Sequence, residues 1–275
     1  MIQGFETREV TDRVIRAFVK SADGVLHKKL KQVDQYEQTE WPTYNDFTVK
    51  PLTMFGILRG TGQLITKCQD FKHPFYYFDH AYWPNDHKHK VNKIFKERIY
   101  RLTKNNFSLN YIDKLSGQDK ERVEKFSKHI KMRDWNYDGK YILILPPSHH
   151  VEKYFGMVGW KDRVCEKLSF NTRRDLIVRE KTDTSSFQEQ LKDAFAVVSC
   201  QSTAAVNAII MGVPSFCEPM SCAAPVSMGI KYLEEIEDPL YAGNRKEWLD
   251  SLLANQYTMT EIENGYAWKR VSRCK

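Results

Sequence analysis

Residues 141–145, Tyr-Ile-Leu-Ile-Leu, form an unbroken apolar run that ends at Pro146-Pro147-Ser148. A run this short and this apolar is typical of a strand that is buried on both faces of a parallel sheet. Further short apolar runs follow at 175–178, 196–199 and 213–216. Parallel strands need a helix-length crossover between them, so this spacing predicts a doubly wound α/β sheet in the second half of the chain.

The segments between these strands have the periodicity of helices. Residues 186–194 and 203–211 show helical spacing, and the small residues of 203–211 would let that helix pack closely on the sheet. The tail has two amphipathic segments, 245–257 and 258–271, in which Thr258 and Thr260 are candidate N-caps. We therefore expect short C-terminal helices after the second sheet.

The first half shows the same alternation. An apolar run within 51–60, a helical segment at 61–71 and a second apolar run at 75–78 predict a β-α-β unit. The loop Gly60-Thr61-Gly62 lacks the third glycine of a dinucleotide-binding loop, because Ile65 stands in its place. A sharp turn that lines a cleft is the better interpretation of this loop.

The polar stretch 133–140 is typical of a linker between two domains. The sequence thus predicts two Rossmann-like α/β domains that face a cleft, 1–136 and 137–275, the second carrying the C-terminal helices.

Net charge also differs between the two halves of the chain. Residues 1–140 contain 26 Lys and Arg against 18 Asp and Glu, a net charge of +8, and the remainder of the chain has a net charge of −1.

Composition places the 275 residues in the globular range, since 41% are hydrophobic and the net charge is only +7. The N-terminus lacks the apolar core of a secretion signal, and no segment approaches the roughly 18 apolar residues of a membrane span. Six cysteines form no C-x-x-C pair, which favours a reducing compartment. We therefore expect a cytoplasmic protein that does not contact a membrane and that is a monomer.

The basic charge is concentrated in 88–133, which holds 14 Lys and Arg and five Asp and Glu. Within it, 120–131 has interleaved acids at helical spacing and is best interpreted as a solvated helix face. In 88–104 the bases alternate with Phe95, Tyr100 and aliphatic residues, a pattern that favours phosphate contacts with aromatic stacking. The candidate phosphate or acceptor contacts in the first half are Arg59, Lys93, Lys96, Arg101 and Asn105.

Hydroxyl side chains follow the apolar run 196–199. Ser199, Ser202 and Thr203 span the end of this strand and the start of the next helix, where free backbone N–H groups and the positive end of the helix dipole favour an anion. A diphosphate fits such a place. The alternative is that Ser202 or Thr203 serves only as an N-cap.

The segment 196–217 resembles the donor-binding segment of GT-B glycosyltransferases, close to polysialyltransferase-like and capsule-type members. The resemblance lies in the serine turn, the small-residue helix and Gly212-Val213-Pro214. It implies a nucleotide sugar donor, most simply a UDP-sugar, bound without a required metal by its diphosphate. Ser148 after the strand 141–145 would then contact the donor, as would Arg179 and Lys181 after 175–178. His149 and His150 follow Ser148 and are either donor neighbours or solvent-facing residues.

The stretch Tyr76 to Trp83, with its Asp79-His80 pair, and the stretch Tyr100 to Asn106 resemble phage-encoded DNA-modifying glycosyltransferases. This resemblance implies transfer of a hexose or pentose to a hydroxyl acceptor in double-stranded DNA, a 5-hydroxymethylated pyrimidine, in the host cytoplasm. Asp79 and His80 come at the end of a predicted parallel strand, where α/β folds carry reactive groups. Asp79 is the predicted general base, with His80 as the other catalytic residue.

Other interpretations stay open. Asp79, His80, Asp86, His87 and His89 have the side chains of a metal site, but their spacing matches no strong signature. A capsule or lipopolysaccharide glycosyltransferase would explain the donor segment, with the basic surface facing an anionic membrane. A non-enzymatic nucleic-acid-binding protein would explain the basic half and leave the serine turn without a role.

Overall fold

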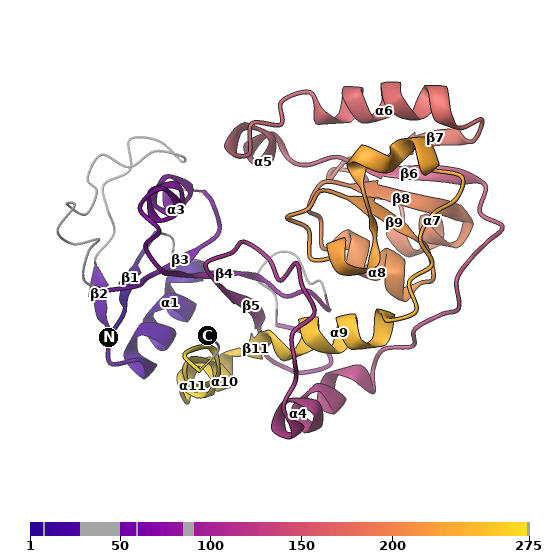
Figure 1. The fold of residues 1–275 in the computed structure, drawn as a ribbon. Coiled ribbons are helices and arrows are strands. Elements are labelled where there is room, and N and C mark those ends of the chain that lie inside the picture. Colours follow the sequence, from indigo (N-terminus) through magenta and orange to yellow (C-terminus); the bar gives the residue numbers. More distant parts are fainter. Residues whose placement is uncertain (8, 28–49, 59, 85–90, 274–275) are drawn as a thin grey trace. The chain divides into compact units, whose positions relative to one another are not determined.

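Figure 1 shows the computed structural model, which describes residues 1–7, 9–27, 50–58, 60–84 and 91–273. The chain divides into two compact units. Unit 1 comprises Met1–Phe107 and Asn255–Lys275, and unit 2 comprises Ser108–Ala254. This division differs from the single predicted boundary after residue 136, because the C-terminal segment returns to the first unit. The functional roles assigned to the two predicted domains stay predictions.

Unit 1 is built on one sheet with the strand order β11-β5-β4-β3-β1-β2. Its strands are β1 (Gln3–Phe5), β2 (Val25–His27), β3 (Leu52–Phe55), β4 (Phe75–His80), β5 (Ile99–Lys104) and β11 (Gln256–Thr258). β2, β1, β3 and β4 pair in parallel, whereas β5 is antiparallel to β4 and to β11. The predicted β-α-β unit is confirmed, with α3 (Thr61–Asp70) joining β3 to β4.

Helices cover both faces of this sheet. α1 (Glu9–Ser21), α10 (Met259–Glu263) and α11 (Tyr266–Val271) lie on one face, and α3 lies on the other (Figure 1). Phe18 of α1 holds the first face together, since its ring meets the edge of Tyr76, Phe78 and Trp268 at centroid distances of 5.6, 5.0 and 5.8 Å. The core of unit 1 therefore joins the N-terminal helix to the C-terminal helices.

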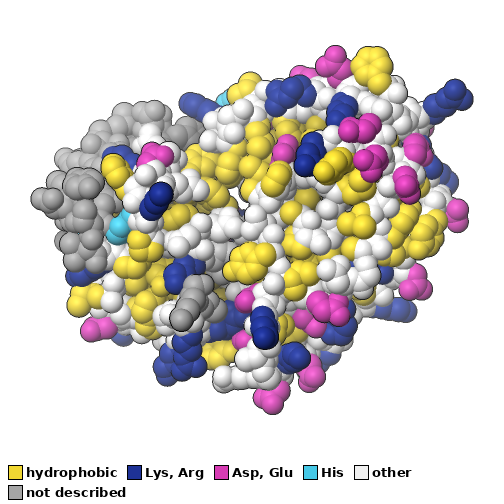
Figure 2. Space-filling model, in the orientation of Figure 1, with side chains coloured by type: hydrophobic (Ala, Val, Ile, Leu, Met, Phe, Trp, Pro, Cys, Tyr) yellow, Lys and Arg dark blue, Asp and Glu magenta, His cyan; other side chains and the backbone are white. Residues whose placement is uncertain are grey.

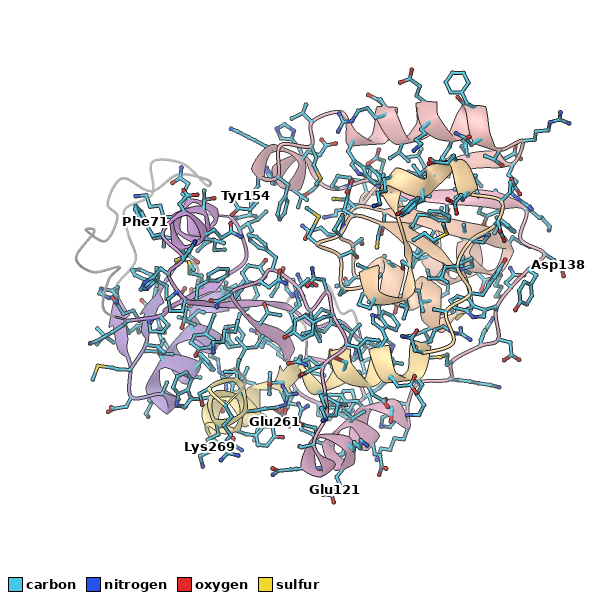
Figure 3. The ribbon with its side chains drawn as sticks, viewed as in Figure 1. Phe71, Glu121, Asp138, Tyr154, Glu261 and Lys269 are labelled. Atoms are coloured by element: carbon cyan, nitrogen blue, oxygen red, sulfur yellow. The ribbon has the colours of Figure 1, made fainter. Side chains whose placement is uncertain are left out.

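The C-terminal tail differs in detail from the prediction. Gln256 and Tyr257 are wholly buried in β11, an edge strand of three residues that is too short for its alternation to be seen in the sequence. Thr258 is the predicted N-cap of α10: its hydroxyl accepts from the Glu261 N–H, and the Glu261 carboxylate accepts from the Thr258 N–H. Glu261 is labelled in Figure 3.

Unit 2 contains a second sheet, with all strands parallel and the order β10-β9-β8-β6-β7. Its strands are β6 (Tyr141–Leu145), β7 (Asp175–Val178), β8 (Ala194–Ser199), β9 (Ser215–Cys217) and β10 (Met228–Gly229). Its helices are α4 (Gly117–Ser127), α5 (His149–Tyr154), α6 (Trp160–Asn171), α7 (Phe187–Asp193), α8 (Ala204–Ile210) and α9 (Arg245–Ala254), with 3₁₀ helices η1 (Ala224–Val226) and η2 (Ile230–Glu235). The predicted doubly wound parallel sheet is confirmed.

Two apolar layers enclose this sheet. One packs Trp160, Val164 and Leu168 of α6 against Ile142 and Val198. The other packs α7 and α8 against the alternate strand residues. Ala208 of α8 is wholly buried in this second layer, which confirms that the small residues let this helix approach the sheet closely. Among the described residues no helix is both long enough and apolar enough to cross a membrane.

The segment 133–140 is packed against unit 2 and does not behave as a free linker. The Arg133 N–H donates to the Ile210 carbonyl at 2.8 Å, and the Asn136 N–H donates to the Gly212 carbonyl at 2.7 Å. Arg245 extends over the ring of Trp135 at 3.8 Å from the centroid. Polar composition predicted a linker because these bonds to a distant turn leave no local signal in the sequence.

Gly212 carries this packing, and its replacement tests it. Its φ is +82°, and a Cβ atom built there would lie 1.9 Å from the Asp134 carbonyl oxygen. We expect Gly212→Ala to destabilise the chain by roughly 2–5 kcal/mol, through backbone strain and displacement of the segment 133–136. Urea unfolding followed by circular dichroism measures this change.

Gly117→Ala is the matched control, because a Cβ atom at Gly117, in the first turn of α4, meets nothing within 4 Å. This substitution should be neutral or stabilise the chain by up to about 1 kcal/mol. Equal unfolding midpoints for the two variants would show that the segment 133–136 does not pack on Gly212.

Candidate functional site

The strand order of unit 2 places a topological switch point between β6 and β8, and we call the gap between the diverging connections at their carboxyl ends the crevice. The connection after β6 leads to α6 on one face of the sheet, and the connection after β8 leads to α8 on the other face. Two neighbouring parallel strands whose connections leave in opposite directions form a topological switch point, where α/β folds bind ligands. Leu145, Ser199 and Cys217 lie in one row across β6, β8 and β9, so the segments after them share one edge.

Hydroxyl groups stand on both sides of this crevice. Ser148 is the N-cap residue of α5, but its side chain makes no capping bond and is half-buried. Across the crevice the Ser202 hydroxyl accepts from the Ala204 N–H at 3.1 Å, which leaves its own proton available to a ligand. Thr203 is 9% exposed beside it. The topology thus places predicted donor residues that are more than 50 positions apart in the sequence at one edge of the sheet.

Ser199 differs from these residues because it is wholly buried in the last position of β8. Its hydroxyl has no hydrogen-bond partner within the described residues. A side chain with no exposed surface does not contact a ligand in this conformation, which differs from the predicted donor contact of Ser199. Ser202 and Thr203 are the residues that reach the edge.

Arg179 follows β7 at the same edge, but its guanidinium binds its own loop. Nη1 donates to the Ser185 hydroxyl at 2.9 Å and to the Gln190 amide oxygen at 2.6 Å, and Nη2 donates to the Ser185 carbonyl at 2.8 Å. These bonds fix the loop between β7 and α7 and differ from the predicted contact with a diphosphate. Lys181 is exposed in this loop, beside β7 and not beside β8.

The sequence analysis missed a carboxylate at this edge. Glu218 follows β9, and its Oε1 accepts from the indole N–H of Trp160 at 2.8 Å, while its backbone N–H donates to the Cys200 carbonyl at 3.1 Å. A half-buried carboxylate held in this way can accept hydrogen bonds from the hydroxyls of a ligand. The only signal in the sequence was a Glu-Pro pair directly after an apolar run.

Two sulfur atoms, one from each of the connections after β6 and β8, are in contact. The Cys200 Sγ lies 3.5 Å from the Met157 Sδ, and burial raises the pKa of the Cys200 thiol to about 12. The thiol therefore stays protonated near neutral pH and is a poor nucleophile. Cys200 packs as a small apolar side chain.

In unit 1 the predicted catalytic residue Asp79 belongs to a buried ion pair. Its Oδ2 accepts from Arg101 Nη2 at 2.7 Å and from the Tyr77 hydroxyl at 2.9 Å, and its Oδ1 accepts from the His80 N–H at 2.8 Å. The side chains of Asp79 and Arg101 are 25% and 8% exposed. The pair forms because Asp79 and Arg101 face each other across the antiparallel strands β4 and β5.

This environment keeps Asp79 ionised. Burial by itself raises the pKa of the Asp79 carboxyl, but the charges of Arg101 and His80 and the hydrogen bonds outweigh it, so the pKa lies below its usual value. Burial and the neighbouring Asp79 charge raise the pKa of the Tyr77 hydroxyl well above its usual value, so that group stays a donor. A carboxylate with a lowered pKa is a strong ion-pair partner and a weak proton acceptor.

His80 lies on the opposite face of β4, because successive strand residues alternate. Its ring meets the edge of Phe55 at a centroid distance of 5.7 Å, on the face that holds Phe78 and Tyr100. Asp79 contacts the backbone of His80 and does not lie along its ring. The two side chains therefore cannot work as one carboxylate–imidazole pair in this conformation.

The predicted acceptor residues separate in the structure. Lys93 and Lys96 are exposed in the turn before β5. Arg101 is the buried partner of Asp79, in place of the predicted contact with acceptor phosphates. The Asn105 Oδ1 accepts from the Phe75 N–H at 2.8 Å, at the edge of the sheet opposite to the end of β4, so Asn105 fixes a turn. Arg59 lies outside the described residues.

The aromatic component of the basic segment is also different from the prediction. Tyr100 is 3% exposed and Leu102 is 1% exposed, and both belong to the core of unit 1. Tyr100 therefore cannot stack on a nucleic-acid base, whereas Phe95, the other predicted aromatic residue, is half-buried in the turn before β5. Lys88 and Lys90 lie outside the described residues, as do Asp86, His87 and His89 of the possible metal site. In the described part of the chain no three His, Cys, Asp or Glu side chains are grouped to hold a metal ion.

A hollow of about 800 Å³ opens on unit 2, at the amino ends of the strands. Lys140 and Asp175, which flank the starts of β6 and β7, line it together with Arg174 and Glu237. Arg174 pairs with Glu237 at 3.0 Å and covers the Phe195 ring at 3.6 Å. The hollow lies at the sheet edge opposite to Ser148 and Ser202, so it is separate from the switch point.

Charge follows the two structural units closely. Over the whole sequence unit 1 holds 22 Lys and Arg against 14 Asp and Glu, a net charge of +8, and unit 2 holds 20 against 21. Figure 2 shows acidic side chains interspersed with basic ones over the visible face of unit 2. The excess of positive charge is therefore a property of unit 1.

No family model matches the sequence, and no curated protein matches it. Among solved structures, the chain is similar to Thermosulfurimonas dismutans KpsC, beta Kdo 2,7 transferase, with a TM-score of 0.52 and 10% identity over 98% of this chain and 99% of that chain. Thermosulfurimonas dismutans KpsC, beta Kdo 2,4 transferase, gives a TM-score of 0.46 and 9% identity over 93% and 90% of the two chains. The first likeness shows the fold. The predicted fold class, α/β with Rossmann-like units of the GT-B kind, is confirmed.

The Asp79–Arg101 pair yields a stability prediction. We expect Arg101→Met to destabilise the chain by about 2–4 kcal/mol at neutral pH, because it leaves an ionised carboxylate buried without its charge partner. Asp79→Leu/Arg101→Met should recover much of that loss. Unfolding in urea measures all three chains.

The loss should also shrink as the pH falls. Wild type keeps the stabilisation from the lowered Asp79 pKa above the usual value of 3.8 and loses it below that value, whereas the variant gains stability as its unpaired carboxyl takes up a proton. Lys246→Met, which breaks an exposed pair with Asp250, should cost less than about 1 kcal/mol. A similar, pH-independent loss for Arg101→Met and Lys246→Met would rule out a buried pair.

Proposed function

We propose that this chain is a glycosyltransferase that takes a sugar from a nucleotide donor bound by unit 2. The observation that carries the proposal is the switch point between β6 and β8, where Ser148 and Ser202 present hydroxyls from opposite sides of the crevice. Likeness in fold to a structure named as a Kdo transferase supports it. A nucleotide sugar provides the phosphate oxygens that hydroxyls and backbone N–H groups bind.

The reaction exchanges one bond for another. The bond between the anomeric carbon and the donor phosphate oxygen breaks, and the acceptor hydroxyl oxygen bonds to that carbon. The nucleotide leaves with the electron pair of the broken bond, and a base removes the proton of the acceptor hydroxyl. Ser202 and Thr203 bind the leaving phosphate in this proposal. Glu218, held by Trp160, accepts hydrogen bonds from donor hydroxyls.

For the acceptor we propose a saccharide hydroxyl, in keeping with the name of the neighbour that shares the fold. The net charge of +8 on unit 1 favours a second candidate, the hydroxymethylated base in double-stranded DNA. Mass spectrometry separates the two. The protein is incubated with mixed nucleotide sugars and either hydroxymethylated duplex DNA or an acidic oligosaccharide, and the mass added to each acceptor is recorded. A result with neither nucleotide release nor added mass on either acceptor, for any of the nucleotide sugars, would contradict a glycosyltransferase.

The donor site yields a binding prediction. We expect Ser202→Ala to weaken binding of the nucleotide sugar by about 1–3 kcal/mol, the usual cost of a lost hydrogen bond to a charged group. Stability should fall by only about 1 kcal/mol, since the lost bond to the Ala204 N–H is a local cap. Isothermal titration calorimetry measures the affinity.

Ser169→Ala is the control, because the Ser169 hydroxyl donates to the Glu166 carbonyl at the other edge of the sheet. Its affinity should equal that of wild type. If Ser202→Ala and Ser169→Ala bind the donor equally well, the serine turn is not the phosphate site.

The general base is tested by pH–rate profiles. If Asp79 is the base, Asp79→Asn should lower kcat by roughly 10²–10⁴, and wild type should show no acid limb above the usual carboxyl pKa of 3.8. If His80 is the base, His80→Ala should cause the large loss, and wild type should show an acid limb that Asp79→Asn keeps and His80→Ala lacks. Wild-type rates in both variants would remove the end of β4 from the reaction.

A further inference from the structure

The turn that precedes β5 presents aliphatic and basic side chains together. Val91 and Ile94 are 54% and 45% exposed, and Lys93 and Lys96 are exposed beside them. Neither aliphatic residue joins the core of unit 1, although Ile99 and Tyr100 a few positions later are buried. Exposed aliphatic side chains between lysines are not explained by the fold or by the donor site.

Hydrogen bonds hold this turn in shape. The Asn92 Oδ1 accepts from the Ile94 N–H at 2.9 Å and from the Phe95 N–H at 3.0 Å, and the Asn92 N–H donates to the Glu97 carbonyl at 2.8 Å. The Glu97 carboxylate accepts from the Thr260 N–H at 2.9 Å, which ties the turn to α10. Ile94 is therefore displayed by a closed turn and does not need to be ordered when a partner binds.

The side chains of this turn fit one of two anionic partners, DNA or a membrane surface, better than the other. DNA phosphates suit the lysines, but Tyr100 is buried and Phe95 is half-buried, and the most exposed apolar side chains of the turn, Val91 and Ile94, neither stack nor hydrogen-bond. A membrane surface uses both kinds of group. Anionic headgroups attract Lys93 and Lys96, and the boundary between headgroups and acyl chains accepts Val91 and Ile94.

We propose that the turn 91–98 docks unit 1 on a membrane surface that contains anionic phospholipids. The net charge of +8 on unit 1 draws the protein to the surface, and the turn gives short-range contact. This proposal replaces our expectation of a protein without membrane contact and does not depend on the proposed reaction, because vesicle binding is measured without donor or acceptor.

The experiment is sedimentation of the full chain with vesicles of phosphatidylcholine, with and without phosphatidylglycerol. We expect binding only where phosphatidylglycerol is present, and a decline as salt rises. Lys93→Gln/Lys96→Gln should weaken partition by about 30-fold, and Ile94→Ser should weaken it by about 5-fold. Ile94→Trp should strengthen it, because Trp favours the membrane interface, and a folding defect cannot produce that gain.

Matched controls lie elsewhere on unit 1. Lys20→Gln/Lys72→Gln removes the same charge from the last turn of α1 and from the position after the α3 C-cap, and Val25→Ser removes a 42% exposed aliphatic residue from the edge strand β2. Val25→Ser should partition like wild type, and Lys20→Gln/Lys72→Gln should weaken partition far less than 30-fold, because it lowers only the long-range attraction. Equal losses in test and control variants overturn the proposal, as does unchanged partition in Ile94→Ser and Ile94→Trp. Duplex DNA binding that is lost in Lys93→Gln/Lys96→Gln while vesicle binding persists would make the turn a nucleic-acid surface.

Discussion

Parallel pairing of β6 with β8 is the constraint on which the candidate donor site depends. Connections between parallel strands are right-handed. The chain goes from β6 to β7 on one side of the pair and from β8 to β9 on the other side, so the two connections leave on opposite faces of the sheet. The first turns of both connections then face one crevice, whatever the side chains in them are. Ser148 and Ser202 come to the same edge for this reason, and Glu218 joins them because β9 continues the sheet beside β8.

The buried pair of Asp79 and Arg101 is a different kind of constraint. A carboxylate and a guanidinium lose most of their hydration in this position, and their mutual attraction with the Tyr77 hydroxyl offsets that loss. The pair also cross-links the parallel part of the unit 1 sheet to its antiparallel part, since β4 and β5 meet there. Whatever role Asp79 has in a reaction, it begins as an ionised, oriented group at a strand end.

The net charge of a unit does not show which of its cations are exposed at the surface. Net charge counts Arg101 and Lys93 equally, yet Arg101 neutralises Asp79 inside the sheet and Lys93 meets solvent. The same holds for the apolar residues, because Tyr100 fills the core and Ile94 is exposed. Only the side chains of a sequence pattern that stay exposed in the fold can form an interaction surface. The segment 88–104, in which bases alternate with apolar residues, contains a closed turn with exposed side chains and the strand β5, most of whose side chains are buried.

The sequence by itself determined the fold class and the alternation of strands and helices from β6 to β9. Tyr141–Leu145 and Asp175–Val178 were predicted at their observed bounds, because buried parallel strands must be continuous and apolar. Ser148, Ser202 and Thr203 were predicted at a strand end because that position follows from the order of strand and helix. Only the tertiary structure decided the rest. Packing of 133–136 on Gly212, the edge strand β11, the clamp made by Arg179 and the pairing of Asp79 with Arg101 all join residues through space, and no local pattern records such contacts.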